Sequence, residues 1–428
     1  MKAFRAIKSA NIDLNGITVL AGENGSGKST LTRTLFYLID AISNYERYVF
    51  ANYKGQMRRL FRQLEMAVRE VSMFSHGIES FELQKYFSKL DFDNRTLNEV
   101  DEIKYMCRDV VIRCAGVLEK YFHSHANQRL RIARLLTYIS MDPDKPFDSQ
   151  AFIASYMAMV QQIYDEFQGK LLRRDINALF ELINTKYEIR LSPENVQISE
   201  NDVNVFGTKQ VGNLFNIQRA IYVDTPMALC NEVDDNPLWK YFNSLISQKR
   251  SVELSTSQKK MKLYIQRIMH GSVEMKEDIF DDELHYIRED NLDIPITQAA
   301  TGIRSFAYIL RLLENGFLDD STLLIIDEPE AHLHPQWVVE FARVLVLLNK
   351  ELGVKILIAS HNPDMVAAIQ TIATTEGLLD DITFYQAIAS DDFTYTYKNC
   401  GSEIGDIFNS FNIALDRIQY YGNGKVGN

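Results

Sequence analysis

Three short runs of hydrophobic residues, each followed directly by polar residues, predict the centre of the fold. The runs are Ile17–Ala21, Leu323–Ile326 and Lys355–Ser360. Continuous apolar runs of this length are typical of strands that are buried on both faces of a parallel sheet. A helix is predicted from about Lys28, because hydrophobic residues recur there at helical spacing. The sequence therefore predicts an α/β fold with helices flanking the sheet.

A large helical insertion is predicted between the first and second of these strands. From 57 to 185 the hydrophobic residues recur every three or four positions, and breaks at Gly77, around Asn94 and at 142–146 predict short helices in a compact domain. Strand-like runs at 187–191 and 220–224 then return the chain to the sheet, and a further helical stretch leads to residue 296. We expect the N-terminal part of the α/β domain at 1–56, the insertion at 57–185 and the rest of the α/β domain at 186–428.

A glycine-rich loop follows the first strand and fits the pattern G-x-x-x-x-G-K-[ST]. A loop of this kind turns backbone N–H groups toward phosphate oxygens, and the next helix adds its positive N-terminus. We expect Lys28 to reach the β- and γ-phosphates of ATP and Ser29 to hold Mg²⁺. The predicted ATP-binding residues are Gly22, Glu23, Asn24, Gly25, Ser26, Gly27, Lys28, Ser29 and Thr30.

Polar residues at the ends of the other two strands predict the rest of the site. Asp327 and Glu328 follow the second strand, and His361 follows the third. Ligands of open α/β sheets bind beyond the carboxyl ends of the strands, so these side chains should meet the glycine-rich loop. We expect Asp327 to hold Mg²⁺ with Ser29, Glu328 to act on the attacking water as general base, and His361 to sense the γ-phosphate.

Composition excludes several classes of protein. The chain has 428 residues, 46% of them hydrophobic, a formal net charge of -11 and no long apolar run, so we expect a cytoplasmic protein without a membrane segment. Its four cysteines, at 107, 114, 230 and 400, have no zinc-site or disulfide spacing. Basic groups at 58–62, 129–134 and 259–262 are interpreted as solvated helix faces, with nucleic-acid contact as the alternative.

The motifs together resemble those of ABC-type ATPases of the OLD and RecF group, soluble relatives of ABC-transporter and SMC heads. The resemblance is carried by the glycine-rich loop, by the run Ile-Ile-Asp-Glu-Pro-Glu-Ala-His-Leu-His-Pro at 325–335, and by Ala-Ser-His-Asn-Pro at 359–363. It implies that 330–335 is the D-loop region, which touches the opposite subunit. His332 and His334 lack further ligands at metal-binding spacing. After His361 we expect no room for the TOPRIM nuclease domain of OLD-type nucleases.

The resemblance also implies a homodimer that closes around two ATP molecules. A signature loop of one subunit then completes the site of the other. The segment 296–306 lies where that signature belongs, although Ala300 replaces its first serine. Thr301, Gly302 and Arg304 are the expected trans contacts, at the N-terminus of a predicted helix. A plain capped helix is the alternative for this segment. Gln56 lies at a reasonable distance for a Q-loop, but a single glutamine is not assigned.

Standalone ATPases with these motifs resemble those that accompany a separate nuclease or toxin in bacterial anti-phage systems, such as Septu-type and PARIS-type ATPases. The resemblance implies an ATP-hydrolysing sensor or scaffold that restrains or licenses an effector protein. The alternative is a DNA-repair clamp of the RecF kind, which binds DNA directly and hydrolyses ATP to release it. A third hypothesis is a nucleotide-gated assembly protein with nearly silent hydrolysis.

Overall fold

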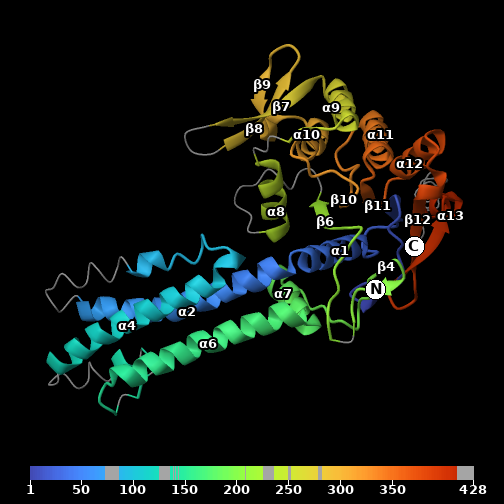
Figure 1. The fold of residues 1–428 in the computed structure, drawn as a ribbon. Helices are drawn as coiled ribbons and strands as arrows, with labels where there is room; N and C mark the ends of the chain where they lie inside the picture. The colour runs from blue at the N-terminus through green and yellow to red at the C-terminus, as the bar shows by residue number, and fades with distance from the viewer. Residues whose placement is uncertain are drawn as a thin grey trace, which may run out of the picture. The chain divides into compact units, whose positions relative to one another are not determined.

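The computed structural model describes residues 1–72, 86–124, 135–137, 139, 141, 142, 144–207, 209–224, 236–248, 252–277 and 282–411. Contacts divide the chain into two compact units, one formed by 1–43 with 179–428 and the other by 44–178 (Figure 1). The first unit holds the main sheet. The second is helical, and each unit is described by itself.

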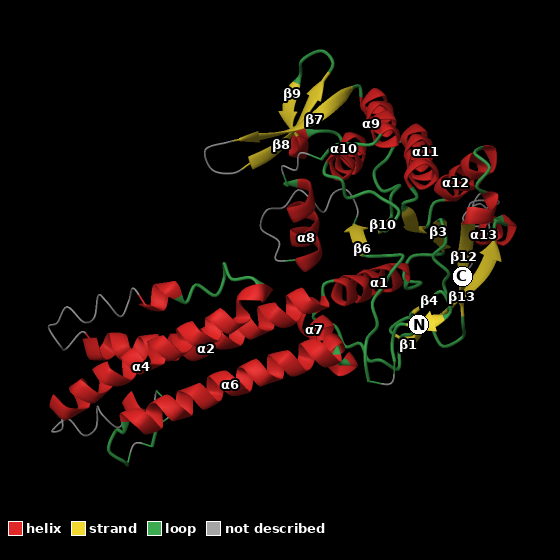
Figure 2. Cartoon of the chain, viewed as in Figure 1, coloured by secondary structure: helices red, strands yellow, loops and turns green. Residues whose placement is uncertain are grey.

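Eight strands form the main sheet, in the order β1-β2-β13-β12-β3-β11-β10-β6. Neighbours from β12 to β6 are parallel, whereas β12 with β13 and β1 with β2 are antiparallel. The predicted α/β fold with a mixed sheet flanked by helices is confirmed (Figure 2). The strands are β1 (Lys2–Phe4), β2 (Ile7–Ala10), β3 (Ile17–Ala21), β6 (Arg219–Val223), β10 (Thr322–Asp327), β11 (Lys355–Ser360), β12 (Ile382–Ala389) and β13 (Tyr395–Gly401).

Hydrophobic side chains cover both faces of the central strands. On one face, Val19 and Leu324 belong to a core that includes residues of α10, α11 and α12. Their chain neighbours Leu20 and Ile325 are fully buried as well. Successive side chains of a strand point to opposite faces, so both faces carry a core. The helices of this unit are α1 (Lys28–Ser43), α7 (Ile176–Tyr187), α8 (Pro237–Ile246), α9 (Thr256–Met269), α10 (Thr301–Glu314), α11 (Pro335–Leu352), α12 (Pro363–Thr375) and α13 (Gly405–Phe411), with short 3₁₀ turns at Ile296–Gln298 and Leu379–Asp381.

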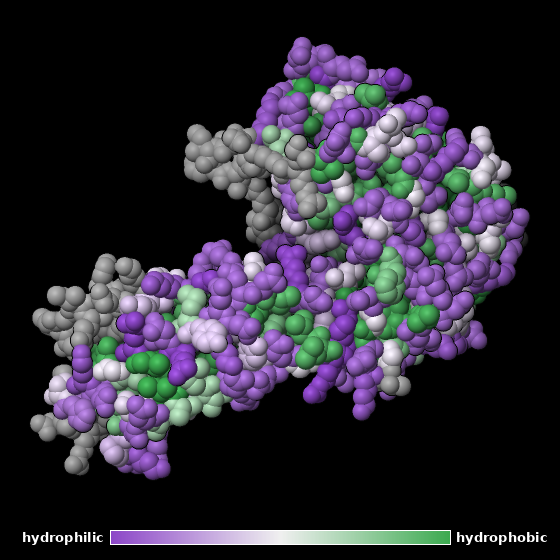
Figure 3. Space-filling model, viewed as in Figure 1, coloured by the Kyte–Doolittle hydropathy of each residue, from purple (hydrophilic) through white to green (hydrophobic). Residues whose placement is uncertain are grey.

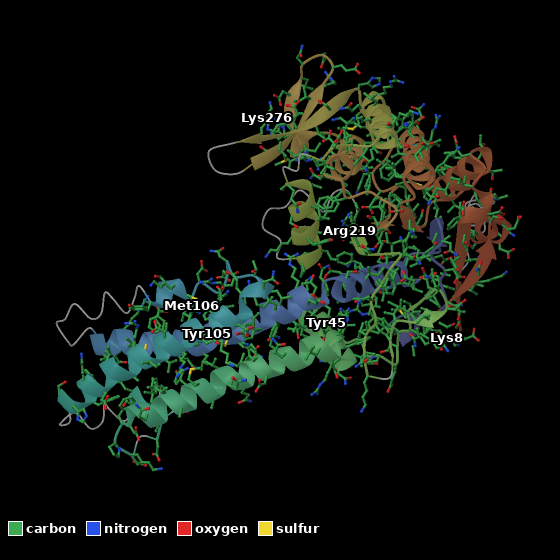
Figure 4. The ribbon with its side chains drawn as sticks, viewed as in Figure 1. Lys8, Tyr45, Tyr105, Met106, Arg219 and Lys276 are labelled. Atoms are coloured by element: carbon green, nitrogen blue, oxygen red, sulfur yellow. The ribbon has the colours of Figure 1, made fainter. Side chains whose placement is uncertain are left out.

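A small antiparallel sheet precedes α10, where the sequence predicted only helices. Helices α8 and α9 are present, but β7 (Gly271–Glu277), β8 (Asp282–Arg288) and β9 (Asp293–Pro295) follow them. The alternation of buried Leu284 and Tyr286 with more exposed residues is the strand signal that this prediction missed. Lys276 of β7 and His285 of β8 both contact the Asp293 carboxylate of β9 (Figure 4). A two-stranded pair, β4 (Ser199–Glu200) and β5 (Val203–Asn204), lies earlier in the chain.

The strand predicted at 187–191 is wrong. Helix α7 continues to Tyr187, whose ring stacks on Tyr37 at 3.8 Å and whose hydroxyl donates to Asp40 at 2.7 Å. The Asn184 side chain then binds both the N–H and the carbonyl of Leu191, at 2.9 and 3.0 Å. These side-chain contacts occupy backbone groups that a strand ladder would need.

The helical unit contains longer helices than the sequence predicted. Helix α2 (Tyr45–Ser72) has 28 residues, and α4 (Val100–Ser124) and α6 (Ser149–Arg173) have 25 each, with a 3₁₀ turn at Leu97–Glu99. The three pack against one another around buried aromatic and cysteine side chains. Gly55 and Gly116 do not interrupt them. The expected breaks near Asn94 and, within the described residues, at 142 and 144–146 do lie between helices.

The surface of this unit exposes a few large hydrophobic residues, and Tyr105 of α4 is 74% exposed (Figure 4). Gln56 lies within α2. The predicted insertion, 57–185, overlaps most of the unit, and the domain boundaries stay a prediction. Gly77, Cys230 and the basic residues Arg129, Arg131 and Arg134 lie outside the described residues.

Candidate nucleotide-binding site

The glycine-rich loop joins β3 to α1 with a backbone that only glycine adopts readily. Gly25 and Gly27 have φ angles of +84° and +89°. At Gly22 a Cβ atom would lie 2.7 Å from the Cβ of Ala387 in β12, so a side chain would not fit there. These glycines therefore allow the loop to turn tightly between its neighbouring strands and the start of α1.

Lys28 folds back over this loop. Its Nζ donates to the carbonyl oxygens of Gly22 and Glu23, at 2.8 and 2.9 Å, and only 5% of the residue is exposed. Burial lowers the pKa of the Lys28 ammonium, and the Asp327 and Glu328 carboxylates act in the opposite direction. The Lys28 ammonium is thus a buried cation at the loop. Phosphate oxygens could replace the two carbonyl oxygens as its hydrogen-bond acceptors.

The other loop residues differ in their surroundings. Ser26 is buried, its Oγ has no hydrogen-bond partner, and its carbonyl accepts from the Tyr397 hydroxyl at 3.2 Å. The side chains of Glu23 and Asn24 are exposed. Thr30 accepts a hydrogen bond from Thr34 through its carbonyl, at 2.6 Å. Ser26 therefore carries an unpaired buried hydroxyl at the loop, which is uncommon in folded proteins.

Asp327 ends β10 beside the loop. Its Oδ2 accepts from the Tyr222 hydroxyl at 2.9 Å and its carboxylate also receives a hydrogen bond from Ser29. Its Oδ1 is buried and has no hydrogen-bond partner. Burial raises the pKa of Asp327. A hydroxyl and a carboxylate with an unshared oxygen suit Mg²⁺, which prefers oxygen ligands, so the residues present fit this ion.

Glu328 and His361 lie together at the same edge. Glu328 has a φ of +49°, and its N–H donates to the Ala359 carbonyl of β11 at 2.8 Å. Its Oε1 lies 3.5 Å from Nδ1 of His361, and both side chains are about one-third to two-fifths exposed. The bend after Asp327 therefore turns the second carboxylate toward the strand that carries the histidine.

A second line of contacts supports Asp327 from β6. Arg33 of α1 donates to the Tyr222 hydroxyl at 3.1 Å and to Asp224 at 3.0 Å. Burial raises the pKa of Tyr222 well above its ordinary value, so this hydroxyl keeps its proton and donates to Asp327. At the other end of β6, Arg219 donates to the Phe317 carbonyl at 3.1 Å (Figure 4).

The signature-like residues form a separate group at the start of α10. Thr301 donates to the His332 carbonyl at 3.1 Å, and a Cβ atom on Gly302 would lie 3.0 Å from the Trp337 ring. Arg304 donates to the carbonyls of Ala299, at 2.8 Å, and Thr297. All these partners belong to the segments just before α10 and just before and within α11. The N-cap residue Ala300 makes no side-chain cap hydrogen bond. The trans role of this segment and its alternative, a plain helix start, both stay predictions.

The two histidines of the 330–335 region take backbone roles. His332 has a φ of +61°, and His334 caps α11 by accepting from the Gln336 N–H at 3.4 Å.

A family model described as an AAA ATPase domain matches residues 1–366. The chain belongs to this AAA ATPase domain family. Its glycine-rich loop joins the parallel strand β3 to helix α1.

Parts of this AAA ATPase are similar to transporter ATPases. Over 106 residues it is 34% identical to a putative ABC transporter ATP-binding protein of Clostridium perfringens, a match that covers 24% of this chain and 36% of that protein. Over 44 residues it is 50% identical to the energy-coupling factor transporter ATP-binding protein EcfA2 of Clostridium perfringens, covering 10% and 15%. The chain thus spans about a third or less of these relatives.

The solved structures to which the chain is similar include SMC heads. The Smc head domain with an extended coiled coil from Pyrococcus furiosus, bound to the C-terminal domain of ScpA, is 10% identical over 98% of both chains, with a TM-score of 0.34. The SMC head domain from Thermotoga maritima is 10% identical over 42% of this chain and 54% of that one, with a TM-score of 0.27.

Within the described residues of the AAA ATPase, no helix is long and apolar enough to cross a membrane. Figure 3 shows hydrophilic residues over most of the visible face.

Sequence reasoning missed three residues of this edge: Tyr222, Arg33 and Glu330. Tyr222 contacts Asp327, and Arg33 contacts Tyr222, from elements far away in the sequence, so no short motif includes them. Glu330 was assigned only to the D-loop region, yet its side chain is 3% exposed and contacts His361. The only available signal was its place in the Glu-Pro-Glu run, which does not reveal burial.

Proposed function

We propose that this chain binds ATP with Mg²⁺ at the carboxyl edge of the main sheet and hydrolyses it to ADP and phosphate. The observation that carries the proposal is the convergence of the Lys28 ammonium, the unpaired Asp327 oxygen and the Glu328 and His361 pair at one edge. Membership of the AAA ATPase domain family supports the same reaction. Buried polar atoms without hydrogen-bond partners, such as Ser26 Oγ and Asp327 Oδ1, are uncommon in folded proteins, and a bound nucleotide with Mg²⁺ would give both atoms partners.

Each residue has a role that its surroundings support. The loop N–H groups and the N-terminus of α1 bind the phosphates, and Lys28 exchanges its two carbonyl acceptors for phosphate oxygens. Ser29 and Asp327 would hold Mg²⁺, which offsets charge on the phosphates when it is bound. Glu328 accepts a proton from the attacking water, and His361 binds on the γ-phosphate side.

A second subunit completes the site in this proposal. Thr301, Gly302 and Arg304 of one subunit face the ATP held by the other, so the functional state is a homodimer with two shared sites. The supporting observation is that α10 begins without a side-chain cap, which leaves its first N–H groups available to an anion.

The biological role that fits this dimer is an ATP-driven sensor or scaffold for a separate effector protein, a nuclease or toxin, as in OLD-like anti-phage ATPases. The helical unit, 44–178, supports this role because it forms a compact unit of its own, whose long helices α2, α4 and α6 pack on one another. A change between ATP-bound and ADP-bound dimers would then reach a partner through this unit.

Native mass spectrometry of the Glu328→Gln protein, co-expressed with the products of neighbouring genes, tests the proposal. With ATP and Mg²⁺ we expect a dimer that carries two nucleotides and a stoichiometric protein partner. The Lys28→Ala protein is the matched control and should remain nucleotide-free. A dimer that retains nucleic acid and no protein partner would instead favour a RecF-like clamp.

A further inference from the structure

Glu330 is a buried carboxylate that none of the predicted roles uses. It follows β10 by three residues, and its side chain is only 3% exposed. Burial raises its pKa. A glutamate in such surroundings destabilises the fold unless its contacts offset the loss of water. The burial of Glu330 therefore has to be explained by what its carboxylate contacts.

The contacts of Glu330 converge on the end of β11. Its Oε1 accepts from the Ser360 hydroxyl at 2.8 Å and from the His361 N–H at 3.1 Å. Nδ1 of His361 lies 3.5 Å from the same oxygen. The Ser360 hydroxyl in turn accepts from the Asn362 N–H at 3.1 Å. One carboxylate oxygen thus accepts from the main chain of His361 and also lies beside its ring.

The turn after β10 brings Glu328 and Glu330 near the same ring nitrogen of His361. Backbone hydrogen bonds from Ala331 to Glu328, at 2.9 Å, and from Leu333 to Glu330, at 3.0 Å, shape this turn. Nδ1 of His361 lies 3.5 Å from Glu328 Oε1 and 3.5 Å from Glu330 Oε1. Carboxylates that face Nδ1 favour the ring form with a proton on that nitrogen, which leaves Nε2 for another partner. The second oxygen of Glu330, Oε2, is buried without a partner.

We propose that Glu330 is a positioning residue for ATP hydrolysis that acts through His361. It orients the imidazole between the turn after β10 and the end of β11, so that Nε2 serves the γ-phosphate side. This inference rests on the proposed role of His361. Glu330 itself does not touch the nucleotide in this proposal, so its removal should lower kcat and leave ATP affinity nearly unchanged.

A double-mutant cycle between Glu330 and His361 tests this inference. Glu330→Gln keeps the shape of the side chain and should lower kcat about tenfold, with less than about a twofold change in the Kd of an ATP analogue. In a His361→Ala background the same substitution should change kcat less than about twofold, because the group through which Glu330 acts is gone. Ser360→Ala removes the other hydrogen bond to the same oxygen and is the matched control, with an expected change below about threefold.

Three outcomes overturn the inference. An equal fall in kcat with and without His361 means that Glu330 acts independently of the histidine. A His361→Ala protein with normal kcat removes the proposed role of His361, and the inference with it. Glu330→Asp, which keeps the charge but shortens the side chain, is the second variant if Glu330→Gln folds poorly. A thermal melt accompanies each variant, and Glu330→Asp with normal kcat would also contradict the proposal.

Discussion

The two halves of the proposed site differ in how much of their polar surface the chain satisfies by itself. At the sheet edge, Asp327 Oδ1 and Ser26 Oγ are buried without hydrogen-bond partners. At the start of α10, Thr301 and Arg304 are bonded to nearby carbonyls of the same chain. The first region is already arranged for a ligand, whereas the second must exchange internal contacts for external ones. We infer that nucleotide binding depends on one chain and that hydrolysis depends on two.

The largest expected effect comes from Lys28→Ala. Loss of this buried ammonium should weaken ATP binding by at least about 100-fold and abolish hydrolysis, because its charge-assisted hydrogen bonds to the phosphate oxygens are lost. Isothermal titration with a slowly hydrolysed analogue measures the affinity. Lys350→Ala is the control, since Lys350 pairs with Glu376 on the surface. Retained affinity in the Lys28→Ala protein would show that the sheet edge is not the nucleotide site.

Glu328→Gln should separate binding from chemistry. The substitution keeps the size of the side chain but removes the proton acceptor, so kcat should fall by about 100-fold or more while affinity is retained. Phosphate release and analogue binding, measured on the same preparation, check both parts. Closed dimers should also accumulate with ATP. Normal turnover would falsify the role assigned to Glu328.

The better-arranged half was also the easier half to predict from sequence. Strands β3, β10 and β11 each combine a continuous apolar run with polar residues at the carboxyl end, so the pattern alone indicated that 28, 327 and 361 would meet. Their roles as ligands and catalysts stay predictions. Tyr222 could not be found this way, because it reaches Asp327 across 105 residues of sequence.

The local sequence pattern gave a wrong prediction where side-chain hydrogen bonds take the place of backbone pairing between strands. Residues 187–191 alternate like a strand, but Asn184 binds the Leu191 backbone and Tyr187 packs in α7. The burial of Glu330 likewise depends on the turn after β10 and on Ser360, which are brought together only by pairing of β10 with β11. Tertiary contacts therefore decided what the linear pattern left open.

A mixing experiment tests whether the α10 region acts on the other subunit. Thr301→Asp adds a carboxylate to the first turn of α10, where it suits the helix but should repel phosphate. We expect about a tenfold loss of hydrolysis with ATP binding retained. An equal mixture with Lys28→Ala protein should recover about a quarter of the wild-type rate, because half the dimers would be mixed and each would have one intact site. Mixed dimers without recovered activity would contradict a shared site.

The smallest expected effect concerns stability and also tests the sheet edge alone. Burial raises the pKa of Asp327, so the folded protein disfavours the ionised form of this carboxylate. The carboxylate therefore destabilises the fold increasingly as the pH rises above the pKa that Asp327 has in the unfolded chain. Asp327→Asn removes the charge and keeps an oxygen that can accept from Tyr222. It should therefore stabilise the nucleotide-free protein by about 1 kcal/mol at neutral pH, with a smaller gain at pH 4, while it weakens Mg²⁺-dependent ATP binding. Thermal melts at both pH values, without and with ATP and Mg²⁺, measure these opposite effects. A less stable Asp327→Asn protein at neutral pH would mean that contacts to the ionised carboxylate outweigh its burial, and the edge would then be stabilised by its own chain rather than arranged for a ligand.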